Sequence, residues 1–386
     1  MSSEVCTQFV SRALSNWNAS DQKIKNPETG RPITIYKQTF KDLAQRCSMY
    51  NNCSMIHGLR NVNGFTCYLD SVLMVLFAVQ NKLIDRYILD MTLDNDNVGQ
   101  AVCDQDPQKN HAAIQKIQDE LRRITFLIRN GEYVSFSHRV CTNLLKRLRR
   151  HCKRYLGTVY ARFYEPVQNS ASDFLAFILN VFGFSEKMHI TLCTENAFKK
   201  RSTDARVAYR TKVINRDVSC LWVVPSDDLN KKRYLRSLLR QYSQTVLEQS
   251  QALYRDSDKK KENPMLYYER TVYWERLPPF FVMELSRVDL VSRKFIHTPI
   301  IPNISIGRRK LFGIVVHLGY VEPDDDNNSP TGTLVGSGHY VAYLKCKNEW
   351  FRYDDLRSKL RKIGGHKDLV QRSEVVNNGI LFFYSL

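Results

Sequence analysis

One stretch of the chain, at residues 58–77, constrains the fold more than any other. Residues 58–66 (GLRNVNGFT) contain Asn and Gly residues that favour a turn. Apolar side chains then recur at helical spacing, at Leu69, Val72, Leu73, Leu76 and Phe77. We therefore predict an amphipathic helix that begins at Cys67, with Thr66 as its cap.

The first residue of this helix carries a thiol. At a helix N-terminus the backbone dipole and the unpaired N–H groups favour the thiol's anion. We therefore expect the pKa of Cys67 to fall below the free value of roughly 8.5, which would make the thiol a usable nucleophile. The same N–H groups can face a developing oxyanion. On this stretch alone, the alternative is a buried structural cysteine.

A second informative stretch lies near the C-terminus. Residues 336–344 (GSGHYVAYL) alternate like a strand whose glycines let a partner approach closely, and residues 350–355 (WFRYDD) form a second short strand. A turn over residues 345–349 would pair the strands and bring Asp354 near His339. The carboxylate would then hold one ring nitrogen and leave the other for Cys67. A lone histidine on a strand is usually structural, but this combination predicts a thiol hydrolase with a Cys–His–Asp triad.

The composition is that of a soluble globular protein, with 43% hydrophobic and 25% charged residues among 386. The longest apolar run, residues 72–79, is far shorter than a membrane span, and the first residues lack a secretion signal pattern. We therefore expect an intracellular protein with no membrane partner. Ten cysteines are too sparse for a disulfide framework, and no Cys-x-x-Cys pair indicates a structural zinc site.

The net charge of +18 comes largely from short basic clusters, at residues 146–150, 199–201, 231–233, 259–261 and 308–310. Such clusters can bind a polyanion or direct nuclear import. We favour solvated faces and loops, because no aromatic and basic nucleic-acid module accompanies the clusters.

The pattern along the chain changes twice. Helical patterns dominate up to Phe184 and strand patterns dominate after Arg270, which predicts an α+β fold. The polar stretch between them contains two expected loops, at residues 195–206 and 256–262. Residues 1–55 read as a separate helical module, in which the turn-rich residues 26–32 divide two helical patterns. The apolar faces of these helices are Phe9, Leu14 and Trp17 in the first, and Phe40, Leu43 and Ala44 in the second.

Four blocks of residues 58–386 resemble, in the same order, the ubiquitin-specific protease family. The first block is the cysteine stretch, and the second and third are residues 168–175 (QNSASDFL) and 277–287 (LPPFFVMELSR). The fourth block comprises residues 312–317, the histidine stretch and residues 380–384. Within the first block, residues 67–71 (CYLDS) look most like the cylindromatosis-type branch of the family. The resemblance implies a papain-like cysteine protease fold over residues 56–386, α+β in class. A thumb would span about residues 56–185, and fingers and palm about residues 186–386.

The resemblance also implies roles for the catalytic residues. Cys67 would be the nucleophile, His339 the general base and Asp354 the residue that orients it, with Asp355 as an aid or a substitute. The family has its oxyanion Asn five residues before the cysteine, where this chain has Val62. One extra residue separates the start of this block from Cys67, so Asn61 or Asn63 would fill the role, and we favour Asn61.

Ubiquitin-binding residues follow from the same blocks. Gln168 and Asp173 would meet the basic tail of ubiquitin, although Ser170 stands where the family has an acid. Gly338 and Tyr340 would shape a narrow channel for the Gly-Gly end of that tail. Metals and organic cofactors have no role in this chemistry.

The implied function is deubiquitination, the hydrolysis of the isopeptide or peptide bond after the C-terminal glycine of ubiquitin. Its partners would be ubiquitin and ubiquitinated proteins. Three alternatives stay open. The chain could be an inactive ubiquitin-binding pseudo-protease, a basic virion protein that binds nucleic acid, or a thiol hydrolase for another ubiquitin-like modifier or a viral polyprotein.

The N-terminal module is similar to the two-cysteine adaptor domain of large DNA viruses. The matching residues are Cys6, Trp17, residues 26–31 (NPETGR), Leu43 and Cys47. This resemblance implies a viral protein with a docking partner for the module, in the host-cell cytoplasm, the nucleus or the virion. The alternative is a small helical extension that caps the main domain.

Overall fold

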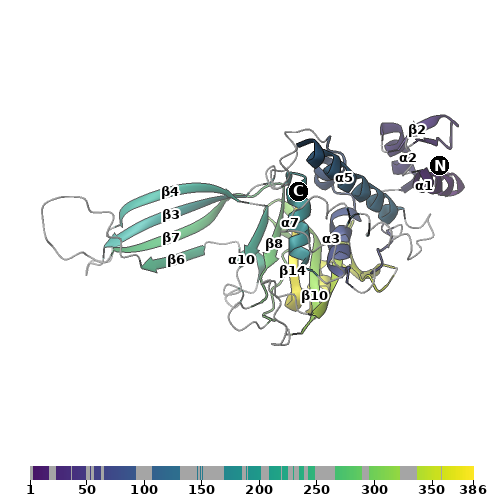
Figure 1. The fold of residues 1–386 in the computed structure, drawn as a ribbon. Helices are drawn as coiled ribbons and strands as arrows, with labels where there is room; N and C mark the ends of the chain where they lie inside the picture. The colour runs from purple at the N-terminus through teal and green to yellow at the C-terminus, as the bar shows by residue number, and fades with distance from the viewer. Residues whose placement is uncertain are drawn as a thin grey trace.

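The computed structural model describes residues 3–16, 23–35, 37–48, 53, 56–61, 65–92, 107–130, 146, 148, 150, 169–184, 188, 190–200, 208–218, 220–224, 229, 234–238, 242–247, 266–288, 295–321, 337–357 and 359–386. These residues form a body of helices packed on a sheet, a second sheet that projects from the body, and a small module at the N-terminus (Figure 1). The α+β class predicted from the sequence is confirmed.

The sheet of the body has eight strands. They are β5 (Leu221–Val224), β8 (Phe280–Leu285), β9 (Ser305–Ile306), β10 (Arg309–Val321), β11 (Ser337–Cys346), β12 (Glu349–Tyr353), β13 (Arg361–Gly364) and β14 (Gly379–Ser385). Their order is β13-β12-β11-β10-β14-β8-β5, with β9 beside β10, and only β5 and β8 pair in parallel. Two short helices, α11 (His366–Val370) and α12 (Ser373–Asn378), connect β13 to β14. The order places β11 between β12 and β13 on one side and β10, β14 and β8 on the other.

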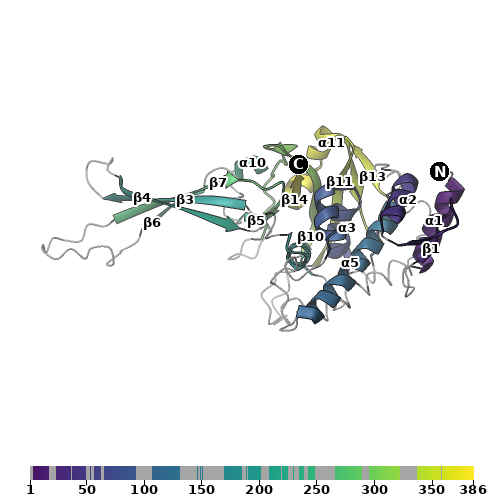
Figure 2. The ribbon, with the colours of Figure 1, turned by 90° about the horizontal axis from the view of Figure 1, so that it is seen from above.

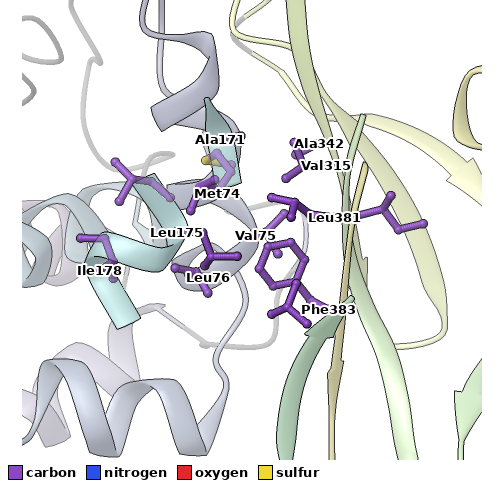
Figure 3. Packing of buried hydrophobic residues seen from close by; sticks show 14 of the residues in the cluster. Met74, Val75, Leu76, Ala171, Leu175, Ile178, Val315, Ala342, Leu381 and Phe383 are labelled. Carbon is purple, nitrogen blue, oxygen red and sulfur yellow. The ribbon is translucent and has the colours of Figure 1, made fainter. Parts of the chain in front are cut away.

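Helices cover this sheet. They are α3 (Cys67–Phe77), α4 (Lys82–Ile84), the π-helix η2 (Asp85–Leu89), α5 (Pro107–Arg129) and α7 (Ala171–Val181). Every residue of α3 is buried, and Val75 packs so closely on β10 that a β-carbon at Gly313 would overlap its side chain. Met74, Leu175 and Phe383 lie in the same contact between helices and sheet (Figure 3). The helix predicted to begin at Cys67 is therefore confirmed, and its position is fixed by tight packing.

The projecting sheet consists of β3 (Ile190–Lys200), β4 (Ala208–Val218), β6 (Tyr242–Leu247) and β7 (Leu266–Arg276), in the antiparallel order β4-β3-β7-β6. It extends away from the body in both views (Figures 1 and 2). A short helix, α10 (Leu235–Leu238), lies between β5 and β6 in the chain. This arrangement matches the fingers that the resemblance implies.

The loop predicted at residues 195–206 is wrong over its first half. Glu195 lies in the middle of β3, opposite Val213 of β4 and Thr271 of β7. Backbone pairing on both edges of β3 outweighs the weak apolar periodicity of this segment. The other predicted loop, at residues 256–262, lies outside the described residues.

The N-terminal module contains α1 (Ser3–Asn16), β1 (Lys23–Lys25), β2 (Pro32–Thr34) and α2 (Gln38–Ser48). Its helices pack through Phe9 and Phe40 around a small apolar cluster of their own, and Phe126 of α5 inserts into that cluster. The side chain of Asn26 accepts hydrogen bonds from the N–H groups of residues 28 and 29 and so shapes the turn between the helices. The two helices are thus present and anchored to α5. The boundary near residue 55 stays a prediction, and Trp17 lies outside the described residues.

The structure contains two disulfides among the described residues, although the low density of cysteines gave no reason to expect them. Cys6 and Cys47 link α1 to α2, with their Cα atoms 5.2 Å apart. Cys53 and Cys346 link the segment before the cysteine stretch to the end of β11, with Cα atoms 5.9 Å apart.

Among the described residues no single helix is long and apolar enough to cross a membrane. One bent pair of helical segments, Cys67–Phe77 and Lys82–Leu89, reaches the required length and apolar character only when the two are taken together.

Candidate active site

Cys67 is buried at the start of α3, where that helix meets β11. The residue before it, Thr66, does not cap the helix with its side chain, contrary to the sequence prediction. Its hydroxyl instead donates a hydrogen bond to the Asp70 carboxylate at 2.7 Å, because this acid lies one turn further along on the buried face of the helix. The helix therefore begins with an internal polar contact, beside the thiol.

His339 lies on β11, and Asp354 directly follows the adjacent strand β12. Strands β11 and β12 pair antiparallel through a tight turn in which Lys347 has a positive φ of 57°. His339 Nε2 lies 3.0 Å from Asp354 Oδ1, so Nδ1 is the ring nitrogen left for Cys67. One donor atom each from Cys67, His339 and Asp355 lie within 4.8 Å of one another, which is the only such group among the described residues. The structure thus brings together the residues chosen from two distant stretches of sequence.

Glycine at position 338 allows this approach. A β-carbon there would overlap the ring of His317 and lie 2.9 Å from the Leu318 carbonyl oxygen. Strand β10, which carries both residues, can therefore lie against β11 directly before His339. The sequence argument for close approach at this glycine is supported by that geometry.

Asp354 is held by a neighbour that the sequence reasoning did not single out. Arg352 donates to Asp354 Oδ2 at 2.8 Å and to Glu374 of α12 at 3.2 Å. Although burial raises the pKa of Asp354, hydrogen bonds from His339, Arg352 and the Leu356 backbone outweigh it and lower that pKa below its usual value. The carboxylate is therefore ionised and fixed in orientation. The signal for Arg352 was its place near the end of β12, two residues before Asp354, which follows that strand directly.

Asp355 is buried, and it approaches the same ring nitrogen of His339 as Asp354 does. Its Oδ1 lies 3.5 Å from His339 Nε2. Burial raises the pKa of Asp355 to about 6, the charge of His339 acts to lower it, and the charge of Asp354 raises it. Asp355 is therefore a buried acid beside both the imidazole and the Cys67 thiol.

The thiol pKa contradicts the sequence expectation. Burial raises the pKa of Cys67 to about 12, the charges of Asp355 and Asp70 raise it as well, and backbone hydrogen bonds from Tyr340 and Tyr68 lower it. The helix dipole contributes only about 0.3–1 kcal/mol, which is too little to offset burial and two acids. The thiol of the ubiquitin-free protein is therefore protonated at neutral pH, and a base must remove the proton for attack.

Asn61 lies close to the start of α3. Its side-chain oxygen accepts from the backbone N–H of Thr66 at 3.2 Å and lies 3.2 Å from the Thr66 hydroxyl oxygen, and its backbone N–H donates to the Asp355 carbonyl. Because the oxygen is occupied, the amide nitrogen is the group available to donate to a substrate oxyanion. The alternative, Asn63, lies outside the described residues.

Besides Gly338, three residues were predicted to bind ubiquitin. Asp173 is exposed on the first turn of α7, where Ser170 caps the helix by accepting from its N–H at 3.3 Å. Tyr340 is buried and its hydroxyl is bonded to the Ala171 backbone, so this residue links β11 to α7 beneath the site. Gln168 lies outside the described residues.

A further acid near this edge was not predicted. Glu284 of β8 is partly buried and hydrogen-bonded to Ser172. Burial raises its pKa, and the nearby Asp173 raises it further. The sequence of residues 277–287 did not indicate that Glu284 contacts α7, because that contact joins residues far apart in the chain.

Solved structures with a similar fold include the SAGA DUB module Ubp8/Sgf11/Sus1/Sgf73. Its complex with monoubiquitin is 16% identical over 98% of this chain and 83% of that chain, with a TM-score of 0.52. Its complex with ubiquitin aldehyde is also 16% identical, over 94% of this chain and 80% of that chain, with a TM-score of 0.53. At this identity the likeness bears on the fold, and it confirms the thumb, palm and fingers arrangement.

A search of curated proteins by sequence found no match. The sequence profile described as ubiquitin carboxyl-terminal hydrolase matches residues 57–384, which is most of the chain. The match includes both stretches that carry Cys67, His339 and Asp354. The chain therefore belongs to the ubiquitin carboxyl-terminal hydrolase family and is a cysteine deubiquitinase.

Proposed function

We propose that Cys67, His339 and Asp354 carry out the hydrolysis of the bond after the C-terminal glycine of ubiquitin. The observation that carries this proposal is the convergence of the three groups. Asp354 Oδ1 lies 3.0 Å from one ring nitrogen of His339, and the Cys67 sulfur lies within 4.8 Å of a ring nitrogen of His339. Oriented imidazole next to a thiol is the arrangement that thiol hydrolases need.

The first half of the reaction begins with the resting thiol. His339 Nδ1 removes the Cys67 proton as the sulfur attacks the glycine carbonyl carbon. The carbonyl oxygen gains negative charge and accepts hydrogen bonds from the Cys67 N–H and the Asn61 amide. Asp354 stabilises the imidazolium that forms. The imidazolium then protonates the lysine amine as the carbon–nitrogen bond breaks, which leaves a thioester on Cys67.

The second half restores the thiol. His339 removes a proton from water, the hydroxide oxygen attacks the thioester carbonyl, and the sulfur leaves with a proton from the imidazolium. Ubiquitin departs with a free C-terminal carboxylate. Every group in this cycle belongs to the chain, the substrate or water, so the mechanism uses no cofactor.

The binding of ubiquitin is supported by the fold and by a charged edge. The solved modules of similar fold are bound to monoubiquitin and to ubiquitin aldehyde. We infer that the projecting sheet grips the ubiquitin body and that Asp173 and Glu284 attract its basic tail. Gln168 and Gly338 complete the proposed tail channel, with Tyr340 positioning α7 beneath it.

Hydrolysis of a ubiquitin-coumarin reporter tests the proposal. The wild-type chain should release coumarin, and Cys67→Ala should lower the rate to background. Cys220→Ala is the matched control, because Cys220 is also a buried cysteine but is not one of the proposed site residues, and this variant should keep wild-type turnover. Equal rates for wild type and Cys67→Ala would remove Cys67 from the mechanism.

An inactive ubiquitin-binding pseudo-protease is the second candidate, and the raised pKa of Cys67 favours it. A ubiquitin vinyl sulfone probe separates the two functions, since only a reactive sulfur forms the covalent adduct. Adduct on wild type and none on Cys67→Ala supports the enzyme. Tight ubiquitin binding without any adduct supports the pseudo-protease.

We propose two finer assignments on sequence resemblance. The cysteine stretch places the chain nearest the cylindromatosis-type branch, and residues 26–31 make the N-terminal module a viral adaptor that docks a partner in the host cell. The bridge between Cys6 and Cys47 joins two of the residues that carry this resemblance. Binding of host or virion proteins by wild type and by a chain lacking residues 1–48 would test the docking role.

A further inference from the structure

A hollow of about 760 Å³ opens beside the catalytic groups, and its lining is basic. Asn61 and Asp355 form the part next to the active site. The rest is formed by Leu356 and Leu360 together with four cations, namely Arg60, Arg357, Lys359 and Arg361. We call it the basic hollow.

The cations of the basic hollow do not stabilise the described part of the fold through ion pairs. Within the described part of the chain, none of the four forms an ion pair, whereas the neighbouring Arg352 is paired with Asp354 and Lys362 with Glu349. Arg357, Lys359 and Arg361 are exposed. Four like charges around one hollow repel each other, so an anionic occupant would relieve an unfavourable arrangement.

The sheet order shows on which side of the reacting bond the basic hollow lies. Strand β11 carries His339, β12 and β13 lie on one side of it, and β8 lies on the other. Glu284 of β8, with the nearby Asp173, forms the acidic edge that we assign to the ubiquitin tail. The basic hollow lies on the side of β12 and β13. A substrate that crosses Cys67 from the acidic edge therefore continues toward the basic hollow.

We propose that the basic hollow binds an acidic segment of the protein that carries ubiquitin, next to the modified lysine. This inference rests on the proposed function, because it assigns the leaving-group side of the same site. The lysine amine departs on the side opposite the ubiquitin tail, so its flanking residues are the ones that reach the four cations. The enzyme then prefers lysines flanked by Asp and Glu.

The lining favours a peptide over a nucleic acid. No aromatic side chain lines the hollow, whereas single-stranded nucleic acids are held largely by stacking of bases on aromatic rings. The hollow is also continuous with Asn61 and Asp355, so its occupant must lie next to the scissile bond. A peptide attached to that bond meets this condition by its covalent connection.

The test uses two substrates in which ubiquitin is joined by an isopeptide bond to a short fluorescent peptide. The lysine is flanked by Glu and Asp in one peptide and by Gln and Asn in the other. We expect wild type to hydrolyse the acidic peptide with roughly tenfold higher kcat/KM at low salt, and this ratio to shrink as salt rises from about 50 to about 500 mM. The ratio is taken within each variant, so a general change in activity cancels.

A triple variant, Arg357→Gln with Lys359→Gln and Arg361→Gln, should bring the ratio to within about twofold of unity. The matched control, Arg308→Gln with Lys310→Gln and Lys367→Gln, removes the same charge from exposed positions outside the hollow and should keep the wild-type ratio. Retention of the ratio in the triple variant, or its loss in the control, would overturn the proposal.

Two further results separate this proposal from others. Equal hydrolysis of both peptides by a wild type that is active on ubiquitin-coumarin would overturn the basic hollow and leave the deubiquitinase standing. Inactivity on the reporter would instead overturn the proposed catalytic function. If a mixed-sequence single-stranded oligonucleotide binds and the peptides are hydrolysed equally, the hollow is a nucleic-acid site and the proposal fails.

Discussion

Cys67 of the ubiquitin-free enzyme should react slowly with small alkylating agents. Burial and two neighbouring carboxyls raise its pKa from 9.0 to about 12. At pH 8 the thiolate fraction is therefore about 10³-fold lower than that of an ordinary cysteine. A more basic thiolate is also more nucleophilic, by roughly 20-fold for a Brønsted slope of about 0.45. The net expectation is alkylation roughly 50-fold slower than that of an exposed cysteine.

The measurement is the rate of iodoacetamide labelling of the peptide that contains Cys67, followed by mass spectrometry between about pH 6 and pH 10. The rate should rise tenfold per pH unit over this range without a plateau, because the titration midpoint lies above it. Asp355→Asn removes one of the charges that oppose the thiolate and should increase the rate. A plateau with a midpoint below about pH 8 would refute the reasoning, since it would mean that the thiolate is already stabilised before ubiquitin binds.

Four other outcomes follow from the contacts of the site and its support. Asp354→Asn should lower kcat by roughly 10²- to 10⁴-fold in the reporter assay, because the imidazole loses its orienting carboxylate. The pKa of Asp354 is lower in the folded protein than in the unfolded chain, so this carboxylate stabilises the fold above the unfolded pKa of about 3.9. That stabilisation is lost as pH falls through the folded pKa. In that acid range, the free energies of unfolding of wild type and Asp354→Asn, measured in urea, should converge. Asn61→Ala should lower kcat by roughly 10²- to 10³-fold with little change in KM, and an unchanged kcat would remove Asn61 from the oxyanion site. Gly313→Ala should destabilise the fold by about 1–3 kcal/mol through overlap with Val75, and addition of Val75→Ala should recover part of that loss in a double-mutant cycle.

The features that the sequence predicted correctly are those set by nearby residues. The start of α3 follows from a turn and an apolar repeat within 20 residues. The contact between His339 and Asp354 follows from one hairpin, whose strands are separated by a two-residue turn. Local periodicity is sufficient in both cases, because side-chain direction is fixed by the period of the element.

The features that were missed depend on residues far apart in the chain. Glu195 looks like a loop residue by composition, but pairing with β4 and β7 places it in a strand. Cys53 and Cys346 are separated by 293 residues, so no local pattern connects them. The pKa of Cys67 was predicted in the wrong direction because the helix terminus is a local feature, while burial and the charge of Asp355 arise only in the folded protein.

The same carboxyls explain how a thiol with a high pKa can serve a hydrolase. Asp355 opposes a free thiolate at Cys67, yet its oxygen also lies 3.5 Å from the imidazole that must become positive, and Asp354 lies 3.0 Å from it. In the mechanism that we propose, the negative charge passes during attack from sulfur to the substrate oxygen, toward Cys67 N–H and Asn61, while the positive charge stays on His339 next to the two carboxyls. The site therefore disfavours the separated thiolate of the resting enzyme and favours the charge distribution of the tetrahedral state, which is the differential stabilisation that lowers a barrier.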